Sequence, residues 1–204
     1  MSRNICITAV EGHTGHLVAE LLLTDENFRK QFDSLAGLSL HPNASSCKEL
    51  EKLGAKIIPH QPGRVREMVK TLQRTGADTM CLIPPAHVEK FDITAELIEA
   101  AKKANIPNVC FISSAGADLA ERDKQPRLRE FIDLECLFMS SKGDLSTATG
   151  HSPVIIRLGF FFSPGTDSWI NIQSKRGILR GEPLTLFPSG QRRGYAAVAH
   201  REIP

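Results

Sequence analysis

The 204-residue sequence is poor in the features that mark nucleic-acid-binding, secreted and membrane proteins. Its formal net charge is only +2, and the basic pairs Arg64/Arg66 and Arg192/Arg193 are too short to follow a polyanion, so direct nucleic-acid binding is not expected. The five cysteines are odd in number and form no C-x-x-C pair, which is typical of free thiols in a reducing compartment. No apolar run approaches the ~20 residues that a membrane-spanning helix needs. We therefore expect a cytoplasmic protein, with the nucleus as a second location, and no membrane partner.

Short apolar runs alternate with amphipathic stretches as far as Phe162. This alternation is typical of repeated strand–helix–strand units and predicts a parallel sheet with helices on both faces. Gly54 follows the second helical stretch and is suited to the left-handed backbone after a helix. The predicted strands are Asn4–Ala9, Leu38–Leu40, Lys56–Ile58, Thr79–Ile83, Asn108–Ile112 and Val154–Arg157. The predicted helices are Gly15–Leu23, Cys47–Leu53, Val65–Arg74, Lys90–Ala104 and Arg127–Met139.

The texture of the sequence changes after Phe162, where a Ser-Pro-Gly turn at residues 163–165 leads into a glycine-rich stretch. A chain of this length is expected to build one main core. We predict that residues 1–162 form an α/β domain, a Rossmann-type doubly wound parallel sheet. Residues 163–204 are predicted to form part of a smaller, irregular substrate-side region.

The first predicted strand runs into a glycine-containing turn and then directly into a helical stretch. Gly12 would let the backbone approach a pyrophosphate, Gly15 would allow close helix packing, and the helix N-terminus would hold the negative charge. Two glycines three residues apart also occur in plain strand-to-helix turns. The alternating units that follow favour a dinucleotide site, and we predict that Ala9, Gly12, His13, Thr14 and Gly15 bind the cofactor.

The end of the second predicted strand bears on the choice between NAD and NADP. A carboxylate there binds the ribose hydroxyls of NAD, whereas a basic or hydroxyl group accommodates the 2′-phosphate of NADP. Residues 38–46 contain no acid and include His41, so NADP is predicted, with NAD as the alternative. His41 is otherwise a solvated loop histidine, and a neutral imidazole is a poor partner for phosphate.

The turn Ala9-Val10-Glu11-Gly12-His13-Thr14-Gly15 is similar to the G-A-T-G-x-T-G turn of the NmrA-like family of atypical short-chain dehydrogenases. Residues 40–42, 50–55, 97–104, 109–117 and 155–161 match the family in the same order. The resemblance covers nearly the whole chain and implies an NAD(P)-binding Rossmann fold.

The chain departs from the family pattern at several positions. Ala9 replaces the first glycine, where a methyl group crowds the turn if the backbone keeps a positive φ. Residues 57–60 lack the aspartate that such proteins often place after the third strand, and His41 stands where the family usually has arginine. Family members continue through more strands and helices, so the resemblance also leads us to expect that this chain is shortened at Pro204.

The predicted cofactor site extends to the ends of three further strands. Leu82, Ile83 and Pro84 end the fourth strand, and Gly159 and Phe160 follow the sixth. By resemblance, Phe160 places an aromatic ring near the nicotinamide, although neighbouring phenylalanines are also common in cores and lids. Ser113 and Ser114 end the fifth strand, where they would either hydrogen-bond substrate or nicotinamide ribose, or simply close the strand in a turn.

The catalytic residues are not identified by the sequence. Short-chain dehydrogenases typically use a Tyr-x-x-x-Lys pair, but the single tyrosine, Tyr195, is followed four residues later by Ala199. NmrA-like enzymes more often carry a lysine four residues before a glutamate on the helix after the fifth strand. If Glu135 is that glutamate, Phe131 occupies the lysine position. The remaining candidates are Ser113, Ser114 and Lys142.

Two functions remain open. The first is an NADP-dependent oxidoreductase acting on a small ketone, quinone or secondary-metabolite intermediate. The second is a catalytically weak redox-sensing regulator that binds NAD(P) and a protein partner such as a transcription factor, which the missing tyrosine and lysine favour. No metal site is predicted, because His13 and His16 straddle a turn without a nearby third ligand.

Overall fold

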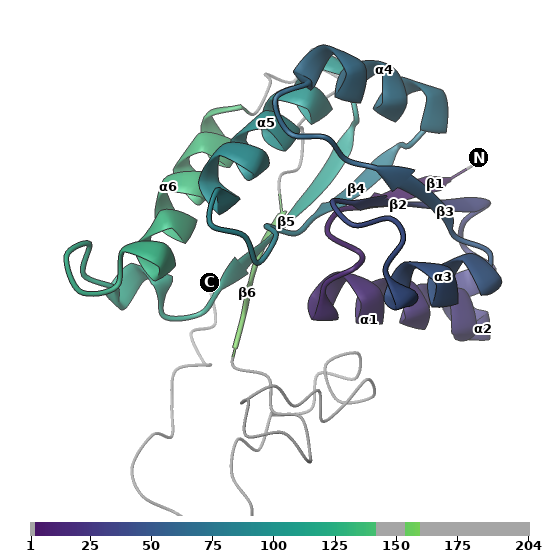
Figure 1. Ribbon diagram of the computed structural model, residues 1–204, viewed down its shortest axis with the longest axis horizontal. Coiled ribbons are helices and arrows are strands. Elements are labelled where there is room, and N and C mark those ends of the chain that lie inside the picture. The colour runs from purple at the N-terminus through teal and green to yellow at the C-terminus, as the bar shows by residue number, and fades with distance from the viewer. Residues whose placement is uncertain (1–2, 142–153, 160–204) are drawn as a thin grey trace, which may run out of the picture. The chain divides into compact units, whose positions relative to one another are not determined.

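The computed structural model describes residues 3–141 and 154–159, which form one α/β unit (Figure 1). Its six strands form a parallel sheet in the order β3-β2-β1-β4-β5-β6. The strands are β1 (Asn4–Ile7), β2 (Ser34–Ser39), β3 (Lys56–Pro59), β4 (Thr79–Leu82), β5 (Asn108–Ser114) and β6 (Val154–Leu158). The helices are α1 (His13–Thr24), α2 (Glu26–Arg29), α3 (Ser45–Lys52), α4 (Val65–Thr75), α5 (Lys90–Lys103), the 3-10 turn η1 (Ala117–Leu119) and α6 (Pro126–Ser140).

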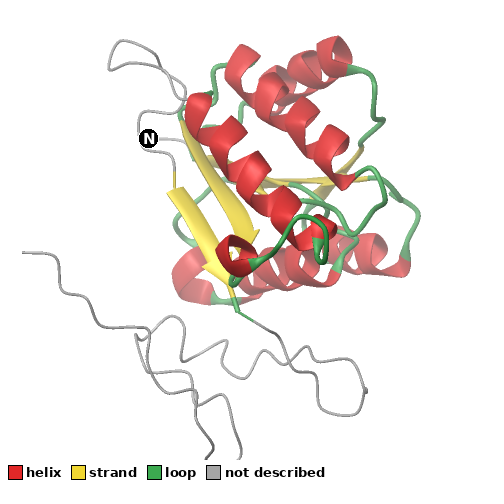
Figure 2. Ribbon diagram, turned by 90° about the vertical axis from the view of Figure 1, so that its left-hand side faces the viewer, coloured by secondary structure: helices red, strands yellow, loops and turns green. Residues whose placement is uncertain are grey.

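The strand order contains a switch point between β1 and β4. The chain runs from β1 outward to β2 and β3, returns through α4 to the other side of β1, and then continues outward through β4, β5 and β6. Because parallel crossovers are right-handed, the helices of the two halves lie on opposite faces of the sheet, as Figure 2 shows. The predicted Rossmann-type doubly wound sheet is confirmed, and ligands of such sheets bind where the strand order reverses.

Each face of the sheet has its own apolar core. On one face, α5 packs into the core through Ile93, Leu97 and Ile98, which recur at helical spacing. Each of these side chains is at most 3% exposed. On the other face Ala19 of α1 and Leu50 of α3 are completely buried. Burial of each large aliphatic side chain contributes roughly 1.5–3 kcal/mol. The two cores thus hold the six strands together, each from its own face of the sheet.

Strand β2 starts at Ser34, four residues before the predicted start at Leu38. The Ser-Leu-Ala-Gly segment shows no clear alternation, which is why its strand character was not predicted. In the structure Gly37 lies between two neighbouring side chains, where an added Cβ would be 2.8 Å from Cγ2 of Val10 and 3.1 Å from Cδ1 of Ile57. The glycine is therefore required by tertiary packing, which no local pattern reveals.

Two short elements were not predicted, namely α2 and η1. Helix α2 is started by Asp25, whose side chain accepts a hydrogen bond of 2.8 Å from the backbone N–H of Asn27.

Gly54 has a φ of +99°, which confirms the predicted left-handed position after α3. The boundary predicted after Phe162 and the region 163–204 lie outside the described residues. Within the described ranges no helix is long and apolar enough to cross a membrane.

Candidate functional site

The turn between β1 and α1 lies at the switch point of the sheet. The N–H of Val10 donates to the carbonyl of Leu38 at 3.2 Å, and the N–H of Gly12 donates to the carbonyl of Ala9 at 3.0 Å. Helix α1 begins at His13 with Gly12 as its N-cap residue, and no side chain caps it. The N–H groups of its first turn are thus left for a ligand or water, and a helix N-terminus favours an anion.

The two glycines of this turn have different structural roles. A Cβ on Gly15 would lie 2.3 Å from the carbonyl oxygen of Ala9, so only glycine lets α1 pack this closely against the turn. A Cβ on Gly12 would lie 3.3 Å from the same oxygen, a contact that small shifts can relieve. The turn therefore forms the close backbone cradle that a pyrophosphate needs, and its residues fit that group.

Ala9 holds the turn in a strained conformation. Its φ is +51°, in the left-handed region where L-residues other than glycine are disfavoured by roughly 1–2 kcal/mol. The positive φ considered from the sequence is therefore present at Ala9.

Thr8 connects the two central strands at the switch point and was missed by the sequence analysis. Its buried hydroxyl donates to the carbonyl of Ile83 at 2.8 Å and accepts from the N–H of Ile83 at 2.7 Å. Its own N–H donates to the carbonyl of Cys81 at 3.1 Å. These bonds position the end of β4, where Ile83 is a predicted cofactor residue. A hydroxyl at the end of an otherwise apolar strand was the available signal.

The tip of β2 carries an acidic side chain that comes from another segment. Oε1 of Glu11 accepts a 3.0 Å hydrogen bond from the N–H of Leu40, and the Glu11 carbonyl accepts one of 3.1 Å from Oγ of Ser46. Oε2 of Glu11 is buried without a hydrogen-bond partner in the described part of the chain. His41, the predicted phosphate partner, is exposed, and its N–H donates to Oγ of Ser39 at 3.0 Å.

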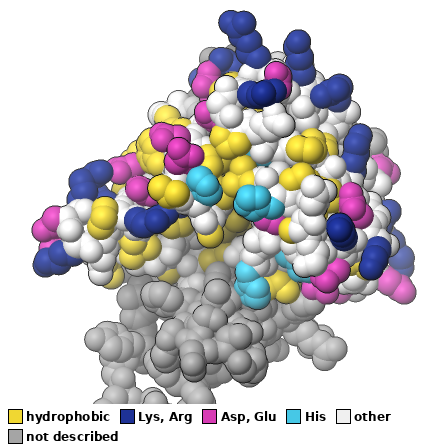
Figure 3. All heavy atoms as spheres, in the orientation of Figure 1, with side chains coloured by type: hydrophobic (Ala, Val, Ile, Leu, Met, Phe, Trp, Pro, Cys, Tyr) yellow, Lys and Arg dark blue, Asp and Glu magenta, His cyan; other side chains and the backbone are white. Residues whose placement is uncertain are grey.

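His60 follows β3 at the same edge and is buried. Its N–H donates to the carbonyl of Ser39 at 2.7 Å. Burial lowers the pKa of His60 below its ordinary value, although the Glu96 and Glu11 carboxylates oppose the shift. Figure 3 shows histidines among hydrophobic side chains near the middle of the described surface, with Lys and Arg toward its margins.

The loops after β4 and β5 present apolar side chains to solvent. Leu82 and Ile83 are buried and Pro84 is half-buried. Val88, in the loop after β4, is 75% exposed, and Leu119, in η1 after β5, is 81% exposed. Both loops leave the carboxyl edge of the sheet, which is where substrates of open α/β folds bind.

Ser113 is held inside the protein by an ionic network. It is buried, and its hydroxyl donates to Oε1 of Glu135 on α6. Nε of Arg157 lies 2.9 Å from Oε1 of Glu135 and Nη2 lies 2.7 Å from Oε2, while Nη1 lies 3.2 Å from Oδ1 of Asp118. Burial raises the pKa of Glu135, but hydrogen bonds from Arg157 and Ser113 outweigh it and hold the pKa below its ordinary value. The Ser114 hydroxyl, by contrast, makes a long 3.4 Å bond to the carbonyl of Ala115.

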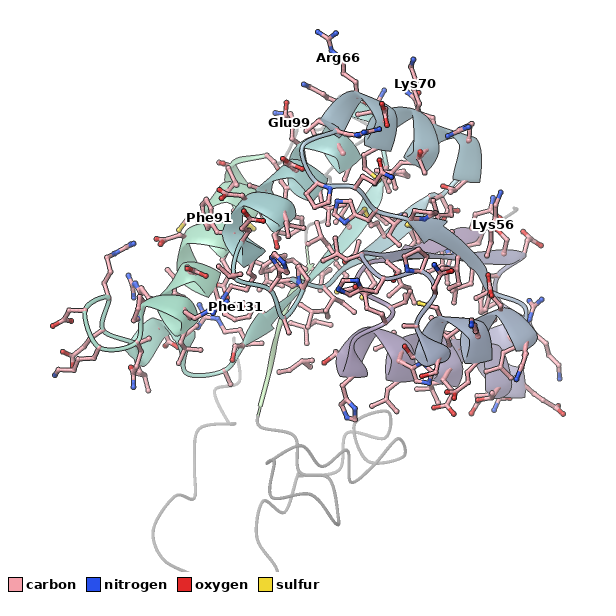
Figure 4. The ribbon with its side chains drawn as sticks, in the orientation of Figure 1. Lys56, Arg66, Lys70, Phe91, Glu99 and Phe131 are labelled. Atoms are coloured by element: carbon pink, nitrogen blue, oxygen red, sulfur yellow. The ribbon has the colours of Figure 1, made fainter. Side chains whose placement is uncertain are left out.

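A lysine ammonium lies beside the position of the missing family lysine, but it comes from another helix. Phe131, labelled on α6 in Figure 4, has Nζ of Lys90 from α5 over its ring at 4.1 Å. The same Nζ lies 2.5 Å from the carbonyl of Arg127 and 3.1 Å from Oε2 of Glu130. Burial lowers the pKa of Lys90, and its hydrogen bond with Glu130 opposes this. These contacts join α5 to α6.

The structure brings together the turn residues, the tip of β2 and the ends of β4 and β5 along one edge of the sheet. Gly159 is exposed directly after β6. No group of three or more His, Cys, Asp or Glu that could hold a metal occurs in residues 3–141 and 154–159. Nε2 of His16 instead lies 3.7 Å from Oε2 of Glu49. Phe160, Lys142, Tyr195 and Ala199 lie outside the described residues.

Comparison with known proteins gives one curated relative and many solved structures of the same fold. No family model matches the chain. An NmrA-like family domain-containing protein of Dictyostelium discoideum is 25% identical over 140 residues, which cover 66% of this chain and 44% of the relative.

Several of the similar structures were solved with NADP(H) bound, among them the following three. The NADPH-dependent quinone oxidoreductase of Escherichia coli has a TM-score of 0.59 and 20% identity over 77% of this chain and 49% of its own. The Citrobacter sp. triphenylmethane reductase has a TM-score of 0.57 and 15% identity, covering 77% and 50%. A short-chain dehydrogenase/reductase of Veillonella parvula has a TM-score of 0.59 and 13% identity, covering 81% and 73%.

These likenesses confirm the resemblance to the NmrA-like family and the Rossmann fold. The chain spans about half the length of the curated relative and of the first two reductases.

Proposed function

We propose, from the likeness to an NmrA-like protein and from the Rossmann fold, that this chain binds NADP(H), with NAD as a second cofactor, and acts as an oxidoreductase. The observation that carries the proposal is the uncapped N-terminus of α1 above the Gly12–Gly15 turn at the switch point. The pyrophosphate would lie over this turn, where first-turn N–H groups and the helix dipole favour its charge. The bound nicotinamide supplies or accepts a hydride.

The two ends of the cofactor would lie along different parts of the carboxyl edge of the sheet. His41 and the tip of β2 lie on the side of β1 that leads to β3, where the adenosine ribose is held in such folds. The nicotinamide would then extend past Ile83 toward the ends of β4 and β5. Thr8 keeps Ile83 in place, and the Glu135–Arg157 pair keeps β5, β6 and α6 together.

For the substrate we propose a small apolar acceptor, with quinones favoured over simple ketones. Val88 and Leu119 expose apolar surface on the two loops that would border the nicotinamide. A ketone that accepts hydride becomes a strongly basic alkoxide and needs a positioned proton donor, which is typically worth 10²–10⁴-fold in rate. Hydride addition to a quinone gives a stabilised phenolate that water can protonate. The phenylalanine at position 131 therefore disfavours ketone reduction more than quinone reduction.

The test combines cofactor affinity with turnover on the purified chain. We expect calorimetric binding of NADPH and NADPH oxidation with quinones that exceeds oxidation with ketones. Gly12→Val, which places side-chain atoms in the phosphate cradle, serves as the control that should lose binding. Binding without turnover on any acceptor would replace the oxidoreductase with the redox-sensing regulator. An absence of binding to both NADPH and NADH would refute the proposal.

A further inference from the structure

We propose that Glu11 is a selectivity residue of the cofactor site, whose carboxylate opposes the 2′-phosphate of NADP and accepts the ribose 2′-hydroxyl of NAD. This inference rests on the proposed function, since it concerns the adenosine end of the same site. With the Glu11 carboxylate present, the site would be less selective for NADP over NAD than it would be with His41 alone.

The position of the carboxylate carries the inference. In dinucleotide-binding folds the group that reads the 2′ position lies at the carboxyl end of the second strand. Here Oε1 of Glu11 is 3.0 Å from the N–H of Leu40, the residue that directly follows β2. The backbone of Glu11 is also fixed to the β2–α3 loop, because its carbonyl accepts from Oγ of Ser46 at 3.1 Å. An acid absent from the β2 sequence is thus supplied by the phosphate-binding turn.

The second carboxylate oxygen of Glu11 lacks a hydrogen-bond donor among the described residues. Oε2 of Glu11 is buried and has no hydrogen-bond partner within residues 3–141 and 154–159. A buried polar atom without a partner is rare and calls for a donor. A ribose hydroxyl is such a donor and an ionised phosphate is not, so the orphaned oxygen matches the unphosphorylated ribose.

The charges around Glu11 do not neutralise it. The Glu11 carboxylate interacts electrostatically with the His60 imidazole, whose pKa is lowered by burial, and with the Cys47 thiol, whose pKa is raised by burial. In the described part of the chain no lysine or arginine pairs with Glu11. A 2′-phosphate placed at this strand tip would therefore meet an uncompensated negative charge, which rejects a ligand through repulsion.

The experiment compares cofactor pairs that differ only at the 2′ position. Dissociation constants of NADP+ and NAD+, and of the fragments 2′,5′-ADP and 5′-ADP, are measured by calorimetry for the wild type and Glu11→Gln. Glutamine keeps the shape and the acceptor for the Leu40 N–H but removes the charge. We expect affinity for the 2′-phosphorylated ligands, relative to their partners, to rise by about tenfold or more, the change that removal of ~1.4 kcal/mol of repulsion produces.

A matched control removes the same charge elsewhere. Glu26→Gln lies on α2, after the C-terminal end of α1, where the Glu26 side chain is 86% exposed, and it should leave the ratio unchanged. His41→Gln, which removes the predicted phosphate partner, should shift the ratio in the opposite direction. Glu11→Thr provides a second uncharged variant if the glutamine variant does not fold.

The outcomes separate the two proposals. If both cofactors bind and the ratio is the same in wild type and Glu11→Gln, or if Glu26→Gln shifts it equally, the role of Glu11 is refuted while the cofactor site stands. If neither cofactor nor fragment binds the folded wild type, the proposed function itself fails. A ratio that rises in both uncharged variants of Glu11, and not in the control, supports the inference.

Discussion

Replacement of Arg157 by methionine tests whether the network on β6 determines the stability of the second half of the sheet. Arg157 contacts Glu135 through two hydrogen bonds and Asp118 through a third contact. Methionine keeps much of the aliphatic stem but, among the described residues, leaves the Glu135 carboxylate with the Ser113 hydroxyl as its remaining donor. The three elements β5, β6 and α6 would then share one poorly compensated charge.

The size of the effect follows from burial. The Glu135 side chain is 10% exposed and that of Arg157 is 39% exposed. Removal of one partner from a buried pair costs ~3–5 kcal/mol, whereas an exposed pair contributes ~0–1 kcal/mol. Because the arginine is partly solvated and water can reach its place, we expect about 2 kcal/mol. The lost free energy of unfolding should be recovered in part by Glu135→Gln on the same background.

The dependence on pH has a defined direction. The folded-state pKa of Glu135 is held below its ordinary value of 4.5. The ion pair therefore contributes fully above the unfolded-state pKa, and its contribution is lost as the pH falls through the folded pKa. The difference between wild type and Arg157→Met should be constant above about pH 5 and should shrink below about pH 4.5.

Urea unfolding at several pH values provides the assay, with a double-mutant cycle over the two positions. Arg122→Met serves as the control, because Arg122 pairs with Asp133 at the surface, where its side chain is 69% exposed. A loss under about 0.5 kcal/mol at pH 7, or additivity of the two single variants, would show that the pair contributes no net coupling.

Three further predictions concern the turn and the sheet. Ala9→Gly should raise the free energy of unfolding by about 0.5 kcal/mol, since relief of strain at a φ of +51° exceeds the added freedom of the unfolded chain; a lower thermal midpoint would contradict this. Gly12→Val should keep the fold but lose calorimetric binding of NADPH, and unchanged affinity would remove the turn from the site. A hydrogen bond from Cys81 lowers the pKa of the Cys110 thiol despite burial, so Cys81→Ala should slow alkylation of Cys110 near pH 8; an equal or faster rate by mass spectrometry would argue against the pairing.

The pattern of apolar residues located every strand of the described sheet, because a strand that is covered on both faces consists of a short run of apolar residues. The prediction was least accurate at β2, where Gly37 is fitted between Val10 and Ile57. The prediction of the site was likewise more accurate for some of its parts than for others. The glycine turn after β1 was recognisable because its function depends on local backbone geometry, which adjacent residues determine.

The parts of the site that depend on distant residues could not be predicted. Ser113 ends a strand in the expected place, yet its hydroxyl is bonded to Glu135, which lies on another element. The lysine position held by Phe131 is approached by Lys90 from α5, which no spacing rule within α6 reveals.

The sequence by itself determined the order of strands and helices, the phosphate-binding turn and the need for glycine at Gly15, since these follow from local periodicity and sterics. Only the tertiary structure decided which charges meet. The second strand contains no acid, but its tip has one, because the chain brings Glu11 within 3.0 Å of Leu40 across the gap between two strands. Electrostatic selectivity depends on distances between side chains, and in a folded chain these are set by packing between segments that are remote in sequence.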